Sequence, residues 1–305
     1  MSSDLPAPPG LDLVRDRIGG AVRSLLSGGP GAEPMEVDHT LVSEPAGDPG
    51  LFGPDSVAWR VGQDAATLIG GVRSLLLQTM HPLAMAGVAG HSDYKNDPWG
   101  RLQRTAQYVG ITTFGSTEAA HRTVESVKRI HKRVQGVAPD GRLYSASDPH
   151  LLTWVHTTEI DSFLVAVQTY GSTELTKAEA DQYVAEMAEL GRMMGGVDVP
   201  ESVAEISKYY RRMQPELLGT RQAREAVRFL LWPPVPLQIR PAYGAVAAAA
   251  VATLPRFVRR ELWLPETERL DGVFAKPMGK LVADVLGWSL GDSPIAAAAH
   301  ARVAG

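Results

Sequence analysis

Apolar residues recur at intervals of three and four along the chain from Ser56 onward, and Pro or Gly separates the periodic segments. This spacing places the apolar residues on one face of an α-helix, whereas a half-buried strand alternates apolar and polar residues. No convincing alternating run is present, so the pattern predicts an all-α fold, a single large bundle-like domain. The expected helices cover residues 56–62, 64–89, 97–109, 117–136, 149–171, 176–194, 200–216, 220–231, 241–253 and two or three short segments up to 290.

The segments that flank this domain have a different composition. Residues 1–55 are rich in Pro, Gly, Ser and acids and predict a partly disordered N-terminal arm with a short amphipathic helix from Leu11 to Ser27. Residues 56–290 form the predicted domain, and residues 291–305 are expected to be a tail. Within the domain, prolines from Trp232 to Pro241 predict an extended connector.

Capping residues support several of the helix starts. Ser116 and Thr117 open one helix, and Asp148 precedes a first-turn proline, Pro149, at the start of another. Thr176 stands three residues before Glu179, which is the spacing of a capping box.

Composition excludes several classes of cofactor and partner. The chain has no Cys, so thiolate-held haem, iron–sulfur clusters and Cys-type zinc sites are excluded. Its net charge of −4 argues against nucleic acid as a partner. The first residues, MSSDLPAPPG, do not resemble a secretory signal, so we expect a cytoplasmic protein. The apolar run from Ala245 to Leu254 is too short to cross a bilayer, which takes about 20 residues.

Two histidines fall on the apolar faces of predicted helices. His131 continues a stripe that contains Val124 and Val127, and His156 lies on a stripe with Ile160. His121 and His150 fall outside these stripes and are expected to be exposed. An inward histidine is usually a core residue that donates to a carbonyl, but neutral imidazole is also the commonest metal ligand and the proximal ligand of many haems.

The segment from Leu75 to Ser92 is unusually apolar and contains His81 directly before a proline. A proline inside a helix bends the axis, and small residues at Gly87 and Gly90 allow another body to approach the backbone closely. Two interpretations remain open, a wall for a flat apolar cofactor and a kinked central helix packed tightly against its neighbours.

A polar face follows on the next predicted helix. Arg101, Arg104 and Thr105 are spaced so that they share one side. Two guanidinium groups beside a hydroxyl can bind carboxylates such as propionates, although the same pattern is common on a solvated basic face.

Four segments together resemble a known family. HPLAMAGVAGHS, DPWGRLQRT, RIHKRVQG and YSASDPHLLTWVH occur in that order within residues 56–215. They are similar to segments of the latex-clearing protein and MpaB-type oxygenases, whose catalytic domain is all-helical and encloses haem b. The resemblance implies that His131 is the proximal iron ligand and that Arg101 and Thr105 lie beside the haem. Arg104 stands where rubber-cleaving members have a lysine. Family members also have an acidic residue upstream of the Arg, whereas the corresponding stretch of this chain is apolar around Met85.

The leading hypothesis is therefore a haem b-dependent oxidoreductase that uses dioxygen or peroxide on an apolar small molecule. Arg101 would neutralise a propionate or orient a polar substrate group, and Thr105 would bond oxygen or a water. Arg104, His156 and His81 complete the predicted cofactor-binding set, with His156 a neighbour of the site or the alternative ligand.

Two other hypotheses remain. One is a metalloenzyme without porphyrin, whose metal centre would use His81, His91, Asp93 and His156. The other is a haem carrier or haem-dependent sensor without turnover.

The C-terminal third predicts contacts with larger partners. The segment from Arg228 to Pro265 mixes Trp, Pro, Leu and basic residues, which is compatible with a peripheral membrane contact. The small residues from Ala245 to Ala252 are expected to seal the core or to form a homo-oligomer contact.

Overall fold

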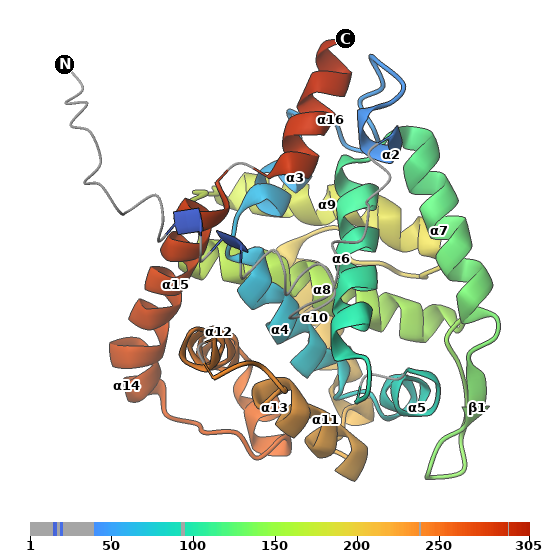
Figure 1. Cartoon of the computed structure of the whole chain (residues 1–305). Coiled ribbons are helices and arrows are strands. Elements are labelled where there is room, and N and C mark those ends of the chain that lie inside the picture. The colour runs from blue at the N-terminus through green and yellow to red at the C-terminus, as the bar shows by residue number, and fades with distance from the viewer. Residues whose placement is uncertain (1–14, 17–18, 21–39, 93–94, 238, 292) are drawn as a thin grey trace.

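The protein, in a computed structural model, is built almost entirely from helices (Figure 1). The structure describes residues 15–16, 19–20, 40–92, 95–237, 239–291 and 293–305. The predicted arm helix from Leu11 to Ser27 lies mostly outside these residues. The helices are α2 Thr40–Ser43, α3 Val57–Gln63, α4 Thr67–Gln78, α5 Pro82–His91, α6 Pro98–Phe114, α7 Thr117–His131, α8 Pro149–Tyr170, α9 Lys177–Met194, α10 Val203–Met213, η1 Gln214–Glu216, α11 Arg221–Leu231, α12 Arg240–Ala252, α13 Arg256–Glu261, α14 Glu268–Leu270, η2 Asp271–Ala275, α15 Lys276–Leu290 and α16 Pro294–Ala304.

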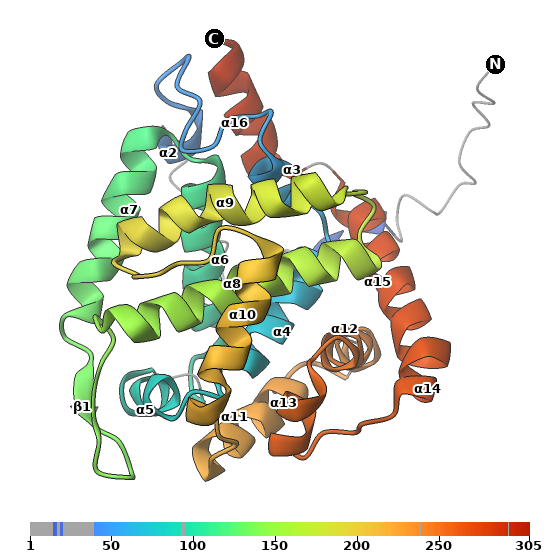
Figure 2. The same ribbon diagram turned by 180° about the vertical axis from the view of Figure 1, so that it is seen from behind.

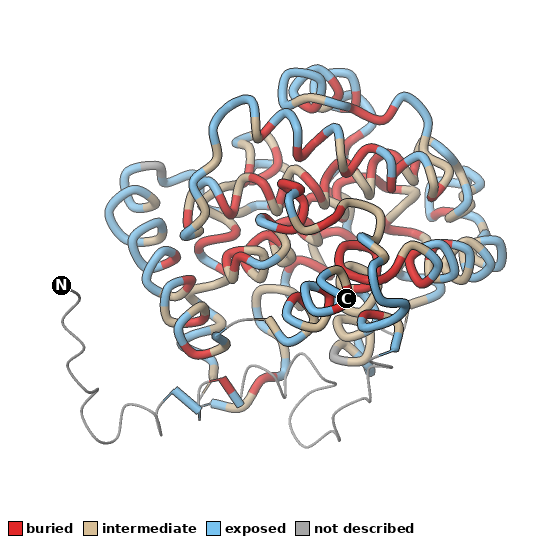
Figure 3. Tube along the Cα trace, turned by 90° about the horizontal axis from the view of Figure 1, so that it is seen from above, coloured by how far each residue is buried: buried red, intermediate tan, exposed pale blue. Residues whose placement is uncertain are grey.

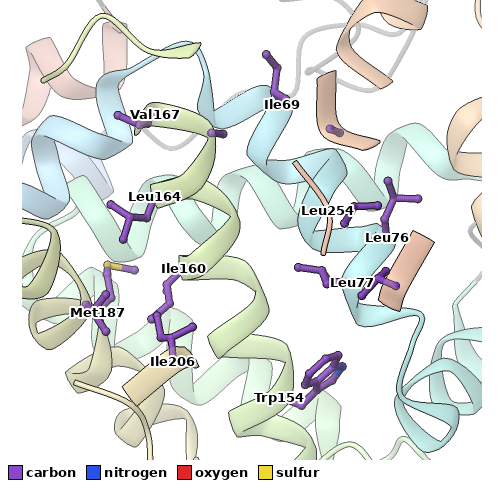
Figure 4. Close-up of a cluster of buried hydrophobic side chains, with 14 of the residues drawn as sticks. Ile69, Leu76, Leu77, Trp154, Ile160, Leu164, Val167, Met187, Ile206 and Leu254 are labelled. Atoms are coloured by element: carbon purple, nitrogen blue, oxygen red, sulfur yellow. The ribbon is translucent and has the colours of Figure 1, made fainter. Parts of the chain in front are cut away.

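Helix α8 runs through the middle of the fold and packs against α4 and α9 (Figure 2). Its buried side chains include Trp154, Ile160 and Leu164. In Figure 4, Ile160 and Leu164 point toward the side where Met187 of α9 lies. Buried positions are concentrated on these inner helices, while the outer helices alternate buried and exposed faces (Figure 3). The expected all-α single domain is therefore confirmed.

The predicted caps are present. Ser116 accepts a hydrogen bond from the Ala119 amide, and Asp148 accepts one from the His150 amide. Thr176 and Glu179 form a complete capping box at the start of α9. These bonds satisfy amide groups that have no partner inside their helix.

The predicted helix over residues 64–89 is in fact two helices. α4 ends at Gln78 and α5 begins at Pro82, with His81 as its N-cap. A proline in the first position of a helix loses no hydrogen bond, so Pro82 starts a new helix here instead of bending an old one.

A short β-hairpin joins α7 to α8, where the sequence pattern predicts no strand. Strands β1 (Gln135–Val137) and β2 (Leu143–Ser145) pair antiparallel, and Gly136 stands opposite Tyr144. Three-residue strands are too short to show the alternation by which a strand is recognised. The predicted helix over 117–136 consequently ends at His131.

Both flanking regions contribute helices to the folded body. Residues 40–43 form α2, and the expected C-terminal tail contains α16. Arg302 of α16 is buried and donates to the carbonyls of Asp48, Val42 and Phe114. This arginine therefore ties the end of the chain to α6 and to the segment around α2.

The C-terminal third combines a buried helix with exposed aromatic residues. Helix α11 ends at Leu231 and α12 begins at Arg240, so Arg240 and Pro241, which the sequence analysis placed in the extended connector, are helical. A proline in the first turn of a helix loses no hydrogen bond. Ala249 and Ala250 of α12 are buried, and the helix packs against α4 and α15. Trp232 and Trp263 are 79% and 75% exposed. Among the described residues, no helix has the length and apolarity that a membrane span requires.

Candidate functional site

His131 occupies the last position of α7 and is half-buried. Its Nδ1 is buried and has no hydrogen-bond partner among the described residues. Burial lowers the pKa of His131, because the charged imidazolium loses hydration. The ring is therefore neutral at physiological pH, which is the form that ligates metals. His121, ten residues earlier on α7, is exposed as its position in the pattern predicts.

The predicted anion-binding residues lie on α6, which packs beside α7 (Figure 1). Ser116, at the turn between the two helices, is midway in the sequence between Arg101 and His131, so both lie at the same end of the pair. Arg101 is half-buried. The Thr105 hydroxyl is exposed and donates to the Arg101 carbonyl oxygen at 3.0 Å.

Arg104 lies on the outer side of the same helix and forms an ion pair with Asp97 at 3.3 Å. Both side chains are exposed, so the pair adds little to stability. An arginine keeps its charge at all ordinary pH values, so Arg104 suits an anion and is a poor iron ligand.

His156 lies on the central helix α8, against a glycine of α9. A Cβ atom at Gly191 would lie 2.6 Å from Cδ2 and 2.8 Å from Nε2 of the His156 ring. Burial lowers the pKa of His156 to about 4, partly offset by a hydrogen bond with the Met187 backbone. Its Nε2 is buried without a partner among the described residues. The close packing on Gly191 leaves this nitrogen facing α9 instead of α6 or α7.

His81 meets two side chains that the sequence analysis did not select. It is buried at the start of α5, and its Nε2 lies 3.7 Å from Oε2 of Glu216. His150, in the first turn of α8, places its Nε2 2.9 Å from the same oxygen. The three side chains come from the starts of α5 and α8 and from η1. No spacing along the sequence therefore predicts that they meet.

The metal set that the sequence suggests around His81 is not assembled among the described residues. His91 is exposed and bonds the Gln135 carbonyl through Nε2 at 3.1 Å. Asp93 lies outside the described residues. His156 packs on α9, as described above.

The small residues of α5 are covered by an aromatic ring from the hairpin. A Cβ at Gly90 would lie 2.9 Å from the Tyr144 hydroxyl, and Gly87 faces the edge of the same ring. The segment could form a wall for a flat cofactor or pack tightly against a neighbouring element. At Gly87 and Gly90 the contacts with Tyr144 support tight packing.

The sequence analysis also did not select Glu159, a half-buried carboxyl group. Glu159 of α8 follows His156 by one helical turn, and burial raises its pKa to about 7. The burial of Tyr108 on α6 and the charge of Glu159 raise the pKa of that tyrosine above its usual value. The sequence feature that could have identified Glu159 is its position beside an otherwise apolar helical stripe.

Comparison with known proteins identifies the family. The family model described as "ER-bound oxygenase mpaB/B'/Rubber oxygenase, catalytic domain" matches residues 59–283 of the chain. No curated protein and no solved structure matches the chain. The match begins within α3, ends within α15 and includes each of the candidate residues above. The chain therefore belongs to the mpaB and rubber oxygenase catalytic-domain family, a family of oxygenases.

Proposed function

We propose that this protein is a haem b-dependent oxygenase that acts on an apolar small molecule and holds the iron through His131. The observation that supports this most directly is the half-buried imidazole at the end of α7, with one ring nitrogen buried and unpaired among the described residues. Unpaired buried polar atoms are costly in folded proteins and call for an explanation. A ligand role gives one.

The candidate residues have the chemistry that a tetrapyrrole with two acidic side chains would require. Burial keeps the His131 ring neutral, so no proton has to leave before a metal binds. Arg101 and Arg104 on the adjacent helix supply the positive charge that propionates require. The haem would supply the oxygen chemistry, while the protein holds and orients it.

The remaining residues have positioning roles in this proposal. Thr105 is exposed, and among the described residues its hydroxyl bonds to the backbone of its own helix, so the group can rotate toward a substrate or a water. Arg101 binds a propionate or orients a polar group of the substrate. Arg104 is held by Asp97 and acts through its charge.

Absorption spectroscopy tests the ligand assignment. We expect the purified chain to give a Soret band after haem reconstitution, and His131→Ala to lose or shift it. His121→Ala is the matched control, because that histidine is on the same helix and exposed. A Soret band of unchanged position and intensity in His131→Ala would overturn the assignment.

Oxygen consumption tests the reaction. The haem-loaded protein is supplied with dioxygen or peroxide and, separately, with a terpenoid, a fatty acid and an aromatic compound. Product formation that depends on His131 supports the enzyme. Haem binding without turnover of any class would favour the carrier or sensor hypothesis and overturn the proposed activity.

A further inference from the structure

Three side chains with metal-binding chemistry meet at a point that the proposed haem function does not use. His81 caps α5, His150 lies in the first turn of α8, and Glu216 ends η1. One ligand atom from each lies within 4.8 Å of the other two. The elements are far apart in the sequence, so the fold itself brings these groups together.

The burial of His81 indicates that the cluster binds a ligand. Its side chain is 1% exposed, and its Nε2 has no hydrogen-bond partner among the described residues. The nearest acceptor, Oε2 of Glu216, is 3.7 Å away, beyond hydrogen-bond range. A buried polar nitrogen aimed at a carboxylate and a second imidazole is an unsatisfied group that a cation would satisfy.

The spacing of the three atoms suits a small metal ion. Bonds of about 2.1 Å in a tetrahedral arrangement place two ligand atoms about 3.4 Å apart. The observed separations of 2.9 Å for His150 and Glu216 and 3.7 Å for His81 and Glu216 lie on either side of that value. Small rotations of the partly exposed His150 and Glu216 side chains would therefore complete the geometry.

We propose that His81, His150 and Glu216 bind one divalent first-row transition-metal ion through two imidazole nitrogens and one carboxylate oxygen. Two histidines and one carboxylate are the ligand set of several zinc enzymes and of non-haem iron(II) oxygenases. Three protein ligands leave coordination positions open. His150 and Glu216 are 44% and 43% exposed, so these positions face solvent and are open to a small molecule.

Binding requires one proton to move within His81. The Leu83 amide donates to Nδ1 at 3.3 Å, which places the proton of the neutral ring on Nε2. Coordination through Nε2 moves that proton to Nδ1 and gives up the Leu83 bond. The bond is long, and the metal takes its place in fixing the ring orientation.

Isothermal titration of the full chain with Zn²⁺, after removal of any affinity tag, tests the site. We expect one Zn²⁺ per chain in the wild type. His150→Ala and Glu216→Gln should each weaken binding by at least about tenfold, since even loss of an outer-shell partner costs that much. Both residues are partly exposed, so both variants should keep the fold, as circular dichroism would show.

Matched controls are available on α7. His121→Ala and Glu118→Gln change the same residue types at exposed positions outside the cluster and should leave the affinity unchanged. Zn²⁺ binding that is equally strong in His150→Ala and in the wild type would overturn the proposal. Absence of stoichiometric binding in the wild type would overturn it as well.

The titration also separates this site from the haem site. His131→Ala should bind Zn²⁺ with wild-type affinity, and His150→Ala should keep the Soret band of the haem-loaded protein. Loss of Zn²⁺ binding in His131→Ala would contradict two separate sites.

Discussion

The Nη1 of Arg73 lies 2.8 Å from Oδ2 of Asp161, between the two central helices α4 and α8. The same nitrogen donates to the Ser162 hydroxyl at 2.7 Å, and the Tyr210 hydroxyl donates to Asp161 at 2.9 Å. The Arg73 side chain is 3% exposed. Removal of one member of such a group leaves a buried charge without compensation.

Arg73→Leu should therefore destabilise the protein by about 3–5 kcal/mol in urea unfolding, because Asp161 keeps its charge inside the fold. Arg122→Leu is the control. Arg122 forms an exposed ion pair with Glu118, so the variant should change stability by less than about 0.5 kcal/mol. Equal losses in the two variants would contradict the role assigned to Arg73.

Gly191→Ala should destabilise the protein through contact with His156. The added Cβ would lie 2.6 Å from the imidazole ring, and overpacking of this kind costs about 1–3 kcal/mol. The Gly191→Ala, His156→Ala double variant removes the clash, so its loss should be smaller than the sum of the two single losses. Additive losses in thermal unfolding would show that the ring and the glycine are not in contact.

Glu159→Gln should stabilise the protein at pH 8 and leave it nearly unchanged at pH 4.5. Burial raises the pKa of Glu159 from 4.5 to about 7. Between these values the unfolded chain has lost a proton that the folded chain retains, so stability falls as the pH rises. The gain at pH 8 should be roughly 1–3 kcal/mol.

The control for Glu159 is Glu189→Gln on the exposed face of α9. Urea unfolding at the two pH values gives the comparison. A gain from Glu159→Gln that is the same at pH 4.5 and pH 8 would show that the carboxyl does not titrate as described.

Arg302→Met should loosen the C-terminal helix. The buried guanidinium donates to carbonyls of Asp48, Val42 and Phe114, and methionine leaves all of them without this donor. We expect a loss of about 3 kcal/mol and faster proteolysis within α16. Unchanged cleavage would mean that α16 is held by its apolar contacts alone.

The sequence was sufficient for the helical architecture because the relevant signals are local. Amphipathic helices such as α7 and α11 carry their own apolar stripe, and Asp148 and Thr176 mark two helix starts correctly. The hairpin between α7 and α8 was missed because its strands are too short to show a period of two. The break at His81 was missed because a proline in a helix and a proline that starts one look alike in sequence.

Some residues of the candidate sites could be predicted from local sequence patterns, and others could not. The inward position of His131 follows from the phase of its own helix. The meeting of His81, His150 and Glu216 depends on how three separate elements pack, and no spacing along the chain encodes it. Glu159 was missed because a single acid beside an apolar stripe normally lies on the solvated flank of a helix.

The hairpin that joins α7 to α8 is also the covalent path from His131 to His150. It is fastened at its base by the bond from the Ala146 amide to the Val134 carbonyl, and Tyr144 braces it against α5. The two imidazoles therefore stand on either side of one fastened connection, His131 at the end of the helix that enters it and His150 in the first turn of the helix that leaves it.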